Sequence, residues 1–120
     1  MLSRNPTGPL TVPRCVVARI ADISSSETLY LMLPKCKVTK IWAVLSGTIT
    51  GTTTLTPSRN AAALTGGVVS VVAGGAGKIA HSVPSANNEF NGVSHYLKIV
   101  GNGGSTNVVP VLVTVEYELR

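Results

Sequence analysis

The chain has 120 residues, of which 44% are hydrophobic and 12% charged, and its net charge is +5. The length favours one domain, and so apolar a composition excludes a disordered tail. The basic residues are dispersed and only 4% of residues are aromatic, whereas nucleic-acid binders usually combine a dense Lys/Arg stripe with aromatic side chains. No stretch approaches the ~18 apolar residues of a membrane span. We therefore expect neither a nucleic-acid nor a membrane partner.

Residues that favour strands and turns dominate the sequence. Val, Ile and Thr make up 36 of the 120 residues, and there are 12 Gly and 7 Pro. β-Branched side chains favour strands, whereas Gly and Pro favour turns. The composition therefore predicts an all-β chain.

Residues 1–13 contain three Pro and one Gly, a content that suits neither a helix nor a central strand. We expect an extended N-terminal arm that is disordered, lies along its own domain, or reaches onto a neighbouring subunit. If the arm reaches a neighbour, the side chains that would bind it are Leu2, Arg4, Leu10 and Val12. Residues 14–120 are expected to form a single β-sandwich domain.

Strand patterns then follow in chain order over residues 14–21, 28–33, 38–46, 48–56, 68–73, 78–81, 95–100 and 107–119. In the third of these, Ile41, Ala43 and Leu45 share one face, while Trp42 points to the other. Because that second face is also partly apolar, the strand either lies between two layers or presents Trp42 to another chain. Trp42 is therefore the candidate anchor for a partner.

Two intervening segments have other patterns. Residues 57–67 carry the only helical signal, with Ser58 or Asn60 as a cap and Gly66 as a stop, and predict one or two helical turns. Residues 82–94 are rich in Asn, Ser and Pro and predict a long surface loop. About eight short strands and one short helix are typical of a two-sheet antiparallel sandwich, and a jelly roll fits the count best.

No arrangement of polar residues predicts a catalytic site. Glu116 and Glu118 point the same way along the last strand, as in a solvated strand face, and no Ser stands in a G-x-S-x-G turn. Neither His81 nor His95 has an acidic residue nearby in sequence to orient it. We expect no enzyme activity and no catalytic residues.

The two cysteines, Cys15 and Cys36, form no metal-binding or redox spacing with each other or with the two histidines. We expect both thiols to be small buried or half-buried residues rather than a disulfide or a site. Gly74, Gly75 and Gly77 predict a flexible turn, because no helix follows them to make a phosphate site. The sequence therefore predicts no metal site and no cofactor.

Three segments have a familiar order: residues 28–41 (TLYLMLPKCKVTKI), the Ala-rich turn at 60–63 (NAAA), and the terminal strand at 111–118 (VLVTVEYE). Over about residues 28–118 the chain resembles small virion proteins of tailed bacteriophages, in particular the jelly-roll decoration or cement proteins of icosahedral heads. This resemblance implies a non-enzymatic homo-oligomer, a dimer or trimer. Its partner would be the major capsid protein, and its location the capsid surface of the virion after synthesis in the host cytoplasm.

Three functions follow as hypotheses. The first is a capsid cement protein that bridges capsomers through the arm and Trp42. The second is a phage tail, fibre or adsorption component that recognises a host surface ligand through loops such as 82–94. The third is a small cellular β-sandwich binding module. Fold alone does not distinguish between them.

Overall fold

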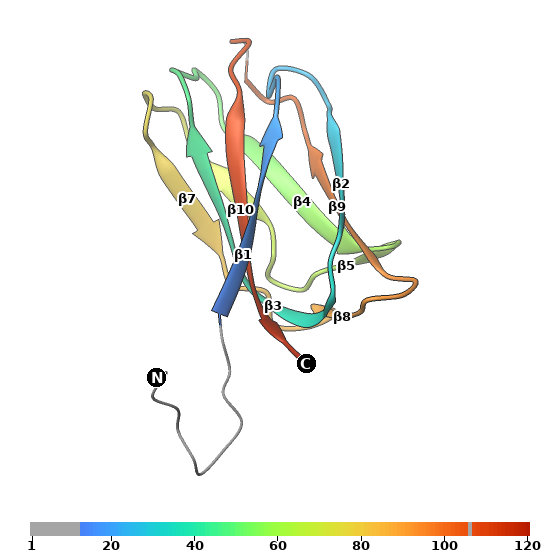
Figure 1. The fold of residues 1–120 in the computed structure, drawn as a ribbon. Helices are drawn as coiled ribbons and strands as arrows, with labels where there is room; N and C mark the ends of the chain where they lie inside the picture. The colour runs from blue at the N-terminus through green and yellow to red at the C-terminus, as the bar shows by residue number, and fades with distance from the viewer. Residues whose placement is uncertain (1–12, 106) are drawn as a thin grey trace, which may run out of the picture.

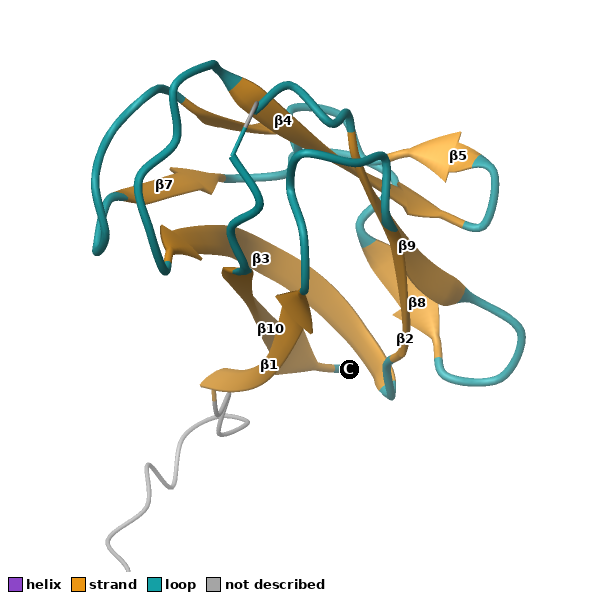
Figure 2. Cartoon of the chain, turned by 90° about the horizontal axis from the view of Figure 1, so that it is seen from above, coloured by secondary structure: helices purple, strands orange, loops and turns teal. Residues whose placement is uncertain are grey.

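The structure is a computed structural model, and it describes residues 13–105 and 107–120. These residues form two antiparallel sheets of five strands each and contain no helix (Figure 1). The sheets lie face to face as two layers, with the core between them (Figure 2). The expected all-β class and the two-sheet sandwich are therefore confirmed.

The first sheet, sheet A, has the order β1-β10-β3-β7, and β8 pairs with the other end of β3. Its strands are β1 (Pro13–Ile20), β3 (Lys35–Leu45), β7 (Ile79–Ser82), β8 (Glu89–Asn91) and β10 (Val111–Leu119). Its longest strand, β3, is central, and β1 lies at one edge.

The second sheet, sheet B, has the order β2-β9-β4-β5, and β6 pairs with the other end of β4. Its strands are β2 (Thr28–Met32), β4 (Thr53–Arg59), β5 (Ala62–Ala63), β6 (Val69–Val71) and β9 (Tyr96–Gly101). The strand expected over 48–56 is thus shifted toward the C-terminus, and Ile49 makes only an isolated bridge to Gly74. A Cβ on Gly51 would lie 2.5 Å from the Gly104 carbonyl oxygen, so the chain before β4 needs a glycine there.

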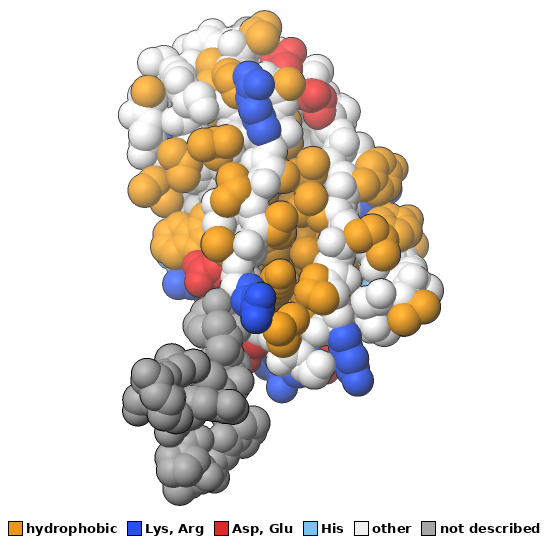
Figure 3. All heavy atoms as spheres, in the orientation of Figure 1, with side chains coloured by type: hydrophobic (Ala, Val, Ile, Leu, Met, Phe, Trp, Pro, Cys, Tyr) orange, Lys and Arg blue, Asp and Glu red, His pale blue; other side chains and the backbone are white. Residues whose placement is uncertain are grey.

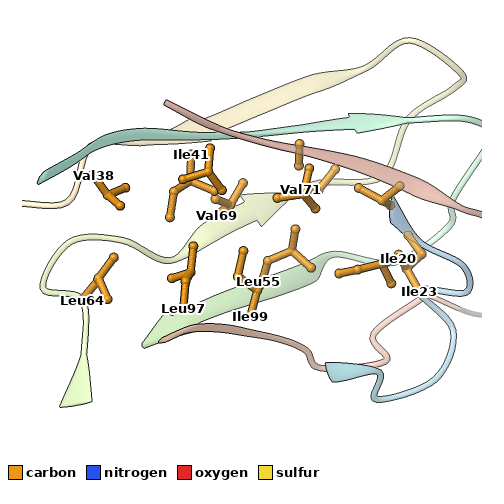
Figure 4. Packing of buried hydrophobic residues seen from close by; sticks show 14 of the residues in the cluster. Ile20, Ile23, Val38, Ile41, Leu55, Leu64, Val69, Val71, Leu97 and Ile99 are labelled. Carbon is orange, nitrogen blue, oxygen red and sulfur yellow. The ribbon is translucent and has the colours of Figure 1, made fainter. Parts of the chain in front are cut away.

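Alternating side chains build the core. On β3 the side chains of Ile41, Ala43 and Leu45 are buried, as their shared face predicts. On β10 the side chains of Val111, Val113 and Val115 are fully buried in the same layer. Figure 4 shows residues of the two sheets meeting between the layers, among them Ile41, Val71, Leu55, Leu97 and Ile99. Burial of these side chains is the main force that holds the sheets together.

The helix expected over residues 57–67 is absent. β4 continues to Arg59, the chain turns at Asn60, and Ala62–Ala63 pairs back onto Ser58 and Arg59. Asn60 has a φ of 53° and exchanges two hydrogen bonds with the Tyr96 backbone. The helix prediction is wrong because these tertiary contacts outweigh the helix propensity of three alanines.

The segment over residues 82–94 is more ordered than a free surface loop. It contains β8, which pairs with the start of β3, and Phe90 is buried in the core. Asn88 is also buried, and its Nδ2 donates to the carbonyl oxygens of Val38 and Pro84. The part after β8 forms an exposed turn, in which Val93 is 82% exposed.

The cysteines are both free, as expected for a chain with no disulfide. Cys36 is buried on β3, and this burial raises the pKa of its thiol to about 11. Cys15, however, is exposed, because it points outward from the edge strand β1. The expectation that both thiols are buried or half-buried is therefore wrong for Cys15.

Candidate docking surface

The outer face of sheet A brings together apolar side chains from four strands. Strand pairing places Val17 opposite Thr114, and Thr114 opposite Trp42. The adjacent row contains Leu112, Val44 and Ile79. Because opposite residues in an antiparallel pair point to the same side, these side chains share one surface. We call it the Trp42 face and define it by Val17, Trp42, Val44, Ile79 and Leu112.

This surface is apolar and open to solvent. Val17 is 57% exposed, Ile79 58% and Leu112 42%. Trp42 and Val44 are half-buried between these neighbours. Figure 3 views this face obliquely, at the left of the molecule, where hydrophobic side chains lie above an acidic and a basic group. Contiguous apolar surface with a polar rim is typical of protein interaction sites.

Polar neighbours fix the orientation of Trp42. Its Nε1 donates a hydrogen bond to the Glu116 carboxylate on β10. The His81 ring on β7 lies against the indole, with 4.8 Å between ring centroids. Lys40 Nζ lies 4.8 Å from the indole centroid, within the range of a cation–π contact. The indole is therefore held from three sides, which lowers the entropy that it would lose on binding a partner.

The outer face of sheet B differs in composition. Strand pairing places Thr56 and Ser58 of β4 on it, opposite Val100 and Lys98 of β9. Its apolar side chains include Met32, which is 65% exposed and lies opposite Tyr96, and Tyr30, whose ring centroid lies 5.8 Å from that of Tyr96. Tyr30 is 62% exposed. This face therefore supplies matched control positions for tests of the Trp42 face.

No group of three His, Cys, Asp or Glu side chains in the described ranges is arranged to hold a metal ion. Within residues 13–105 and 107–120 there is also no helix that is long and apolar enough to span a membrane. Glu116 and Glu118 lie on the outer face as expected, but Glu116 bonds Trp42 and Glu118 lies opposite Lys37.

The sequence-predicted site residues fall into two groups. Leu2, Arg4, Leu10 and Val12 lie outside the described residues. Trp42 lies on the apolar face described above, between Val44 and the polar neighbours that contact its indole. Val17, Ile79 and His81 could not be identified from the sequence, because only strand pairing brings β1 and β7 beside β10 and β3. The alternation of Ile79 and His81 was the available signal, but it does not reveal which strand lies next to them.

Comparisons with known proteins add no family. The sequence matches no protein-family model, and no curated protein matches it.

Proposed function

We propose that this protein is a non-enzymatic virion structural protein, a capsid decoration or cement protein. It would bind the outer surface of an icosahedral head at capsomer junctions and stabilise it. The observation that carries the proposal is the Trp42 face, which is apolar, is exposed and contains the single Trp of the chain. Trp is among the residues that contribute most to protein interfaces, and the described chain itself leaves this surface open.

The sandwich is further proposed to be a jelly roll. In sheet A the first strand lies beside the last, in the order β1-β10-β3-β7. In sheet B the second strand lies beside β9, and β9 beside β4. Such nested pairing, from the chain ends inward, is expected when one long hairpin wraps into two sheets. Jelly rolls include many viral capsid domains, which supports the proposal together with the resemblance in motif order.

Multivalent binding is the proposed mechanism. A dimer or trimer that touches several capsomers gains effective concentration, so each Trp42 face need contribute only modest affinity. The arm at residues 1–13 would add contacts to a neighbouring subunit through Leu2, Arg4, Leu10 and Val12. The bound state resists internal pressure because shell subunits cannot separate without breaking several contacts at once.

One observation favours the alternative, a tail or adsorption component that recognises a host ligand. The turn after β8 projects from the sandwich, and Val93 in it is 82% exposed. The backbone amides of Val93, Ser94 and His95 all donate to Asn91 Oδ1, so the turn presents Val93 in a fixed conformation. Fixed exposed turns often serve in recognition.

Copy number separates the two functions. Quantitative mass spectrometry of purified particles gives the ratio of this protein to the major shell protein. A ratio of the same order as that of the shell protein is expected for a cement protein. A far lower ratio would favour the tail or fibre, and absence from the particle would overturn both.

Binding by variants then tests the surface. Purified protein is added to particles that lack it, and the bound fraction is measured by co-sedimentation. Trp42→Ala is expected to weaken binding by at least about tenfold. Tyr30→Ala, a similarly large aromatic truncation on the other sheet, is expected to bind normally. Equal binding by both variants would exclude the Trp42 face, and deletion of residues 1–12 tests the arm without shortening β1.

A further inference from the structure

β1 has one unpaired edge. It pairs with β10 on one side, and no strand of the described residues pairs with it on the other. Exposed edges usually carry charges, bulges or prolines that discourage pairing with another chain. The middle of β1, residues 15–18, is uncharged, and Arg14 and Arg19 lie only toward its ends. This edge is therefore suited to receive another strand.

We propose that the strand it receives is β1 of a second copy, paired antiparallel about a two-fold axis at Val17. The two copies of sheet A would then form one continuous sheet, and the two Trp42 faces one continuous surface. This inference rests on the homo-oligomer of the proposed function and assigns its interface. A two-fold interface presents the same patch on both copies, which is the commonest arrangement in oligomers.

Side-chain alternation restricts the register. Residues directly opposite in an antiparallel pair must share a face, so either Val16 or Val17 lies on the axis of a pairing that uses most of β1. Centring on Val16 brings Pro13 into the ladder, and proline has no N–H to donate. Centring on Val17 pairs only residues 14–20, each of which has a backbone N–H. The register at Val17 is therefore preferred.

Charge complementarity favours the same register. With Val17 on the axis, Arg19 of the second copy lies opposite Cys15, and Cys15 lies opposite Glu116 on β10. A shallow hollow of about 250 Å³ is lined here by Arg14, Cys15, Thr114 and Glu116. Strands lie about 4.8 Å apart, so an Arg side chain that crosses the small Cys15 reaches the Glu116 carboxylate. Two such ion pairs form by symmetry.

The pairing also covers apolar surface on the inner side. Val16 of β1 and Leu29 and Leu31 of β2 pack against the core but are only half-buried. Figure 3 shows a stripe of hydrophobic side chains between the positions of β1 and β2, where the sandwich is open. In the proposed dimer Val16 lies opposite Ala18 of the second copy, so the second sandwich closes this open side.

Cross-linking tests the interface. Val17→Cys in a Cys15→Ser background places two thiols at the axis, and mild oxidation is expected to give a disulfide-linked dimer. The matched control is Tyr30→Cys in the same background, which is similarly exposed but lies on the edge strand of sheet B. Wild-type protein is expected to form a dimer in sedimentation experiments as its concentration is raised to about 100 µM. A monomer throughout, or cross-linking of Tyr30→Cys as fast as that of Val17→Cys, would overturn the proposal.

Charge exchange tests the register. Arg19→Glu and Glu116→Arg should each weaken the dimer at least about tenfold, and the double variant should restore dimerisation. The double variant also lacks the hydrogen bond between Glu116 and Trp42. If it dimerises again, the dimer must therefore be restored by the ion pair that Arg19→Glu and Glu116→Arg form across the interface. No restoration, or restoration only by Arg19→Glu with Glu118→Arg, would exclude the register at Val17.

The outcome is separable from that of the proposed function. If the protein sediments as a monomer but still coats particles, the β1 interface is excluded and the cement role stands. If the protein forms the β1 dimer but is absent from particles, the interface stands and the cement role is excluded.

Discussion

Trp42 on β3 and Glu116 on β10 are joined by a hydrogen bond from the indole Nε1 to the carboxylate. They are diagonal neighbours, since Trp42 lies opposite Thr114 and Glu116 opposite Lys40. The carboxylate therefore satisfies the one polar group of the indole, and Lys40, opposite Glu116 in the ladder, places its Nζ over the ring. The apolar part of the ring is left to contact a partner.

Removal of this hydrogen bond is expected to change the environment of the indole strongly and the stability of the fold only slightly. Glu116→Ala should lower the free energy of unfolding by only about 1 kcal/mol, because the pair is partly solvated. It should also shift the Trp42 fluorescence emission, since the chain has a single Trp. Glu118→Ala, on the same strand but not bonded to Trp42, is the control. Equal emission spectra for the two variants would contradict the assigned contact.

The buried thiol of Cys36 predicts a specific loss of stability at alkaline pH. Burial raises the pKa of Cys36 from 9.0 to about 11. Below pH 9 the thiol is protonated in both the folded and the unfolded chain, so it contributes no pH dependence. Between these two pKa values only the unfolded chain loses the proton, and the free energy of unfolding should fall by up to about 3 kcal/mol.

Denaturant titrations of wild type and Cys36→Ala across this range measure the effect. Between pH 9 and 11 the free energy of unfolding should fall less for the variant than for wild type. The other titrating groups are the same in both proteins, so their effects cancel in the difference. A thiol reagent at neutral pH should react quickly with Cys15 and with Cys36 only on unfolding. Parallel pH profiles would show that Cys36 is not protected.

Most strands could be predicted from the sequence because their alternation is local, but β5 and β8 were missed because they lie in the segments predicted as a helix and a loop. Ile41, Ala43 and Leu45 read as one face before any partner strand is known, and Val111 to Val115 do so as well. The helix at 57–67 was predicted wrongly because the contact between Asn60 and Tyr96 is not local. The Trp42 face was predictable only at Trp42 itself, because β1 and β7 join it from remote parts of the chain.

Asn88 is buried and holds backbone together, although its polar, Asn-rich segment predicts a surface loop. Its Nδ2 donates to two backbone carbonyls, those of Val38 and Pro84, and the side chain is 4% exposed. Asn88→Ala should lower the free energy of unfolding by about 2 kcal/mol, because buried polar partners lose their donor. Ser85→Ala, at an exposed position in the same segment, should change it by less than about 0.5 kcal/mol. Equal stabilities in denaturant would contradict the role of Asn88 in holding β8 against β3.

Gly51 allows the close approach of two loops. A Cβ there would lie 2.5 Å from the Gly104 carbonyl oxygen, whereas a Cβ on Gly75 would meet nothing nearer than 4.0 Å. Gly51→Ala should therefore destabilise the fold by at least about 1 kcal/mol, because backbone must shift. Gly75→Ala should be close to neutral, and the difference is measurable by thermal unfolding. A neutral Gly51→Ala would mean that the two loops separate at little cost.

The Trp42 face should be dispensable for folding if its purpose is binding. Ile79 and Leu112 are exposed, so the double variant Ile79→Thr/Leu112→Thr should change the free energy of unfolding by less than about 1 kcal/mol. Val113→Thr places a hydroxyl at a fully buried position next to Leu112 on β10 and should cost about 1–3 kcal/mol. The double variant should also bind a hydrophobic dye less and lose affinity for particles. If it instead unfolds as readily as Val113→Thr, these side chains stabilise the sandwich itself, and their exposure no longer argues for a partner.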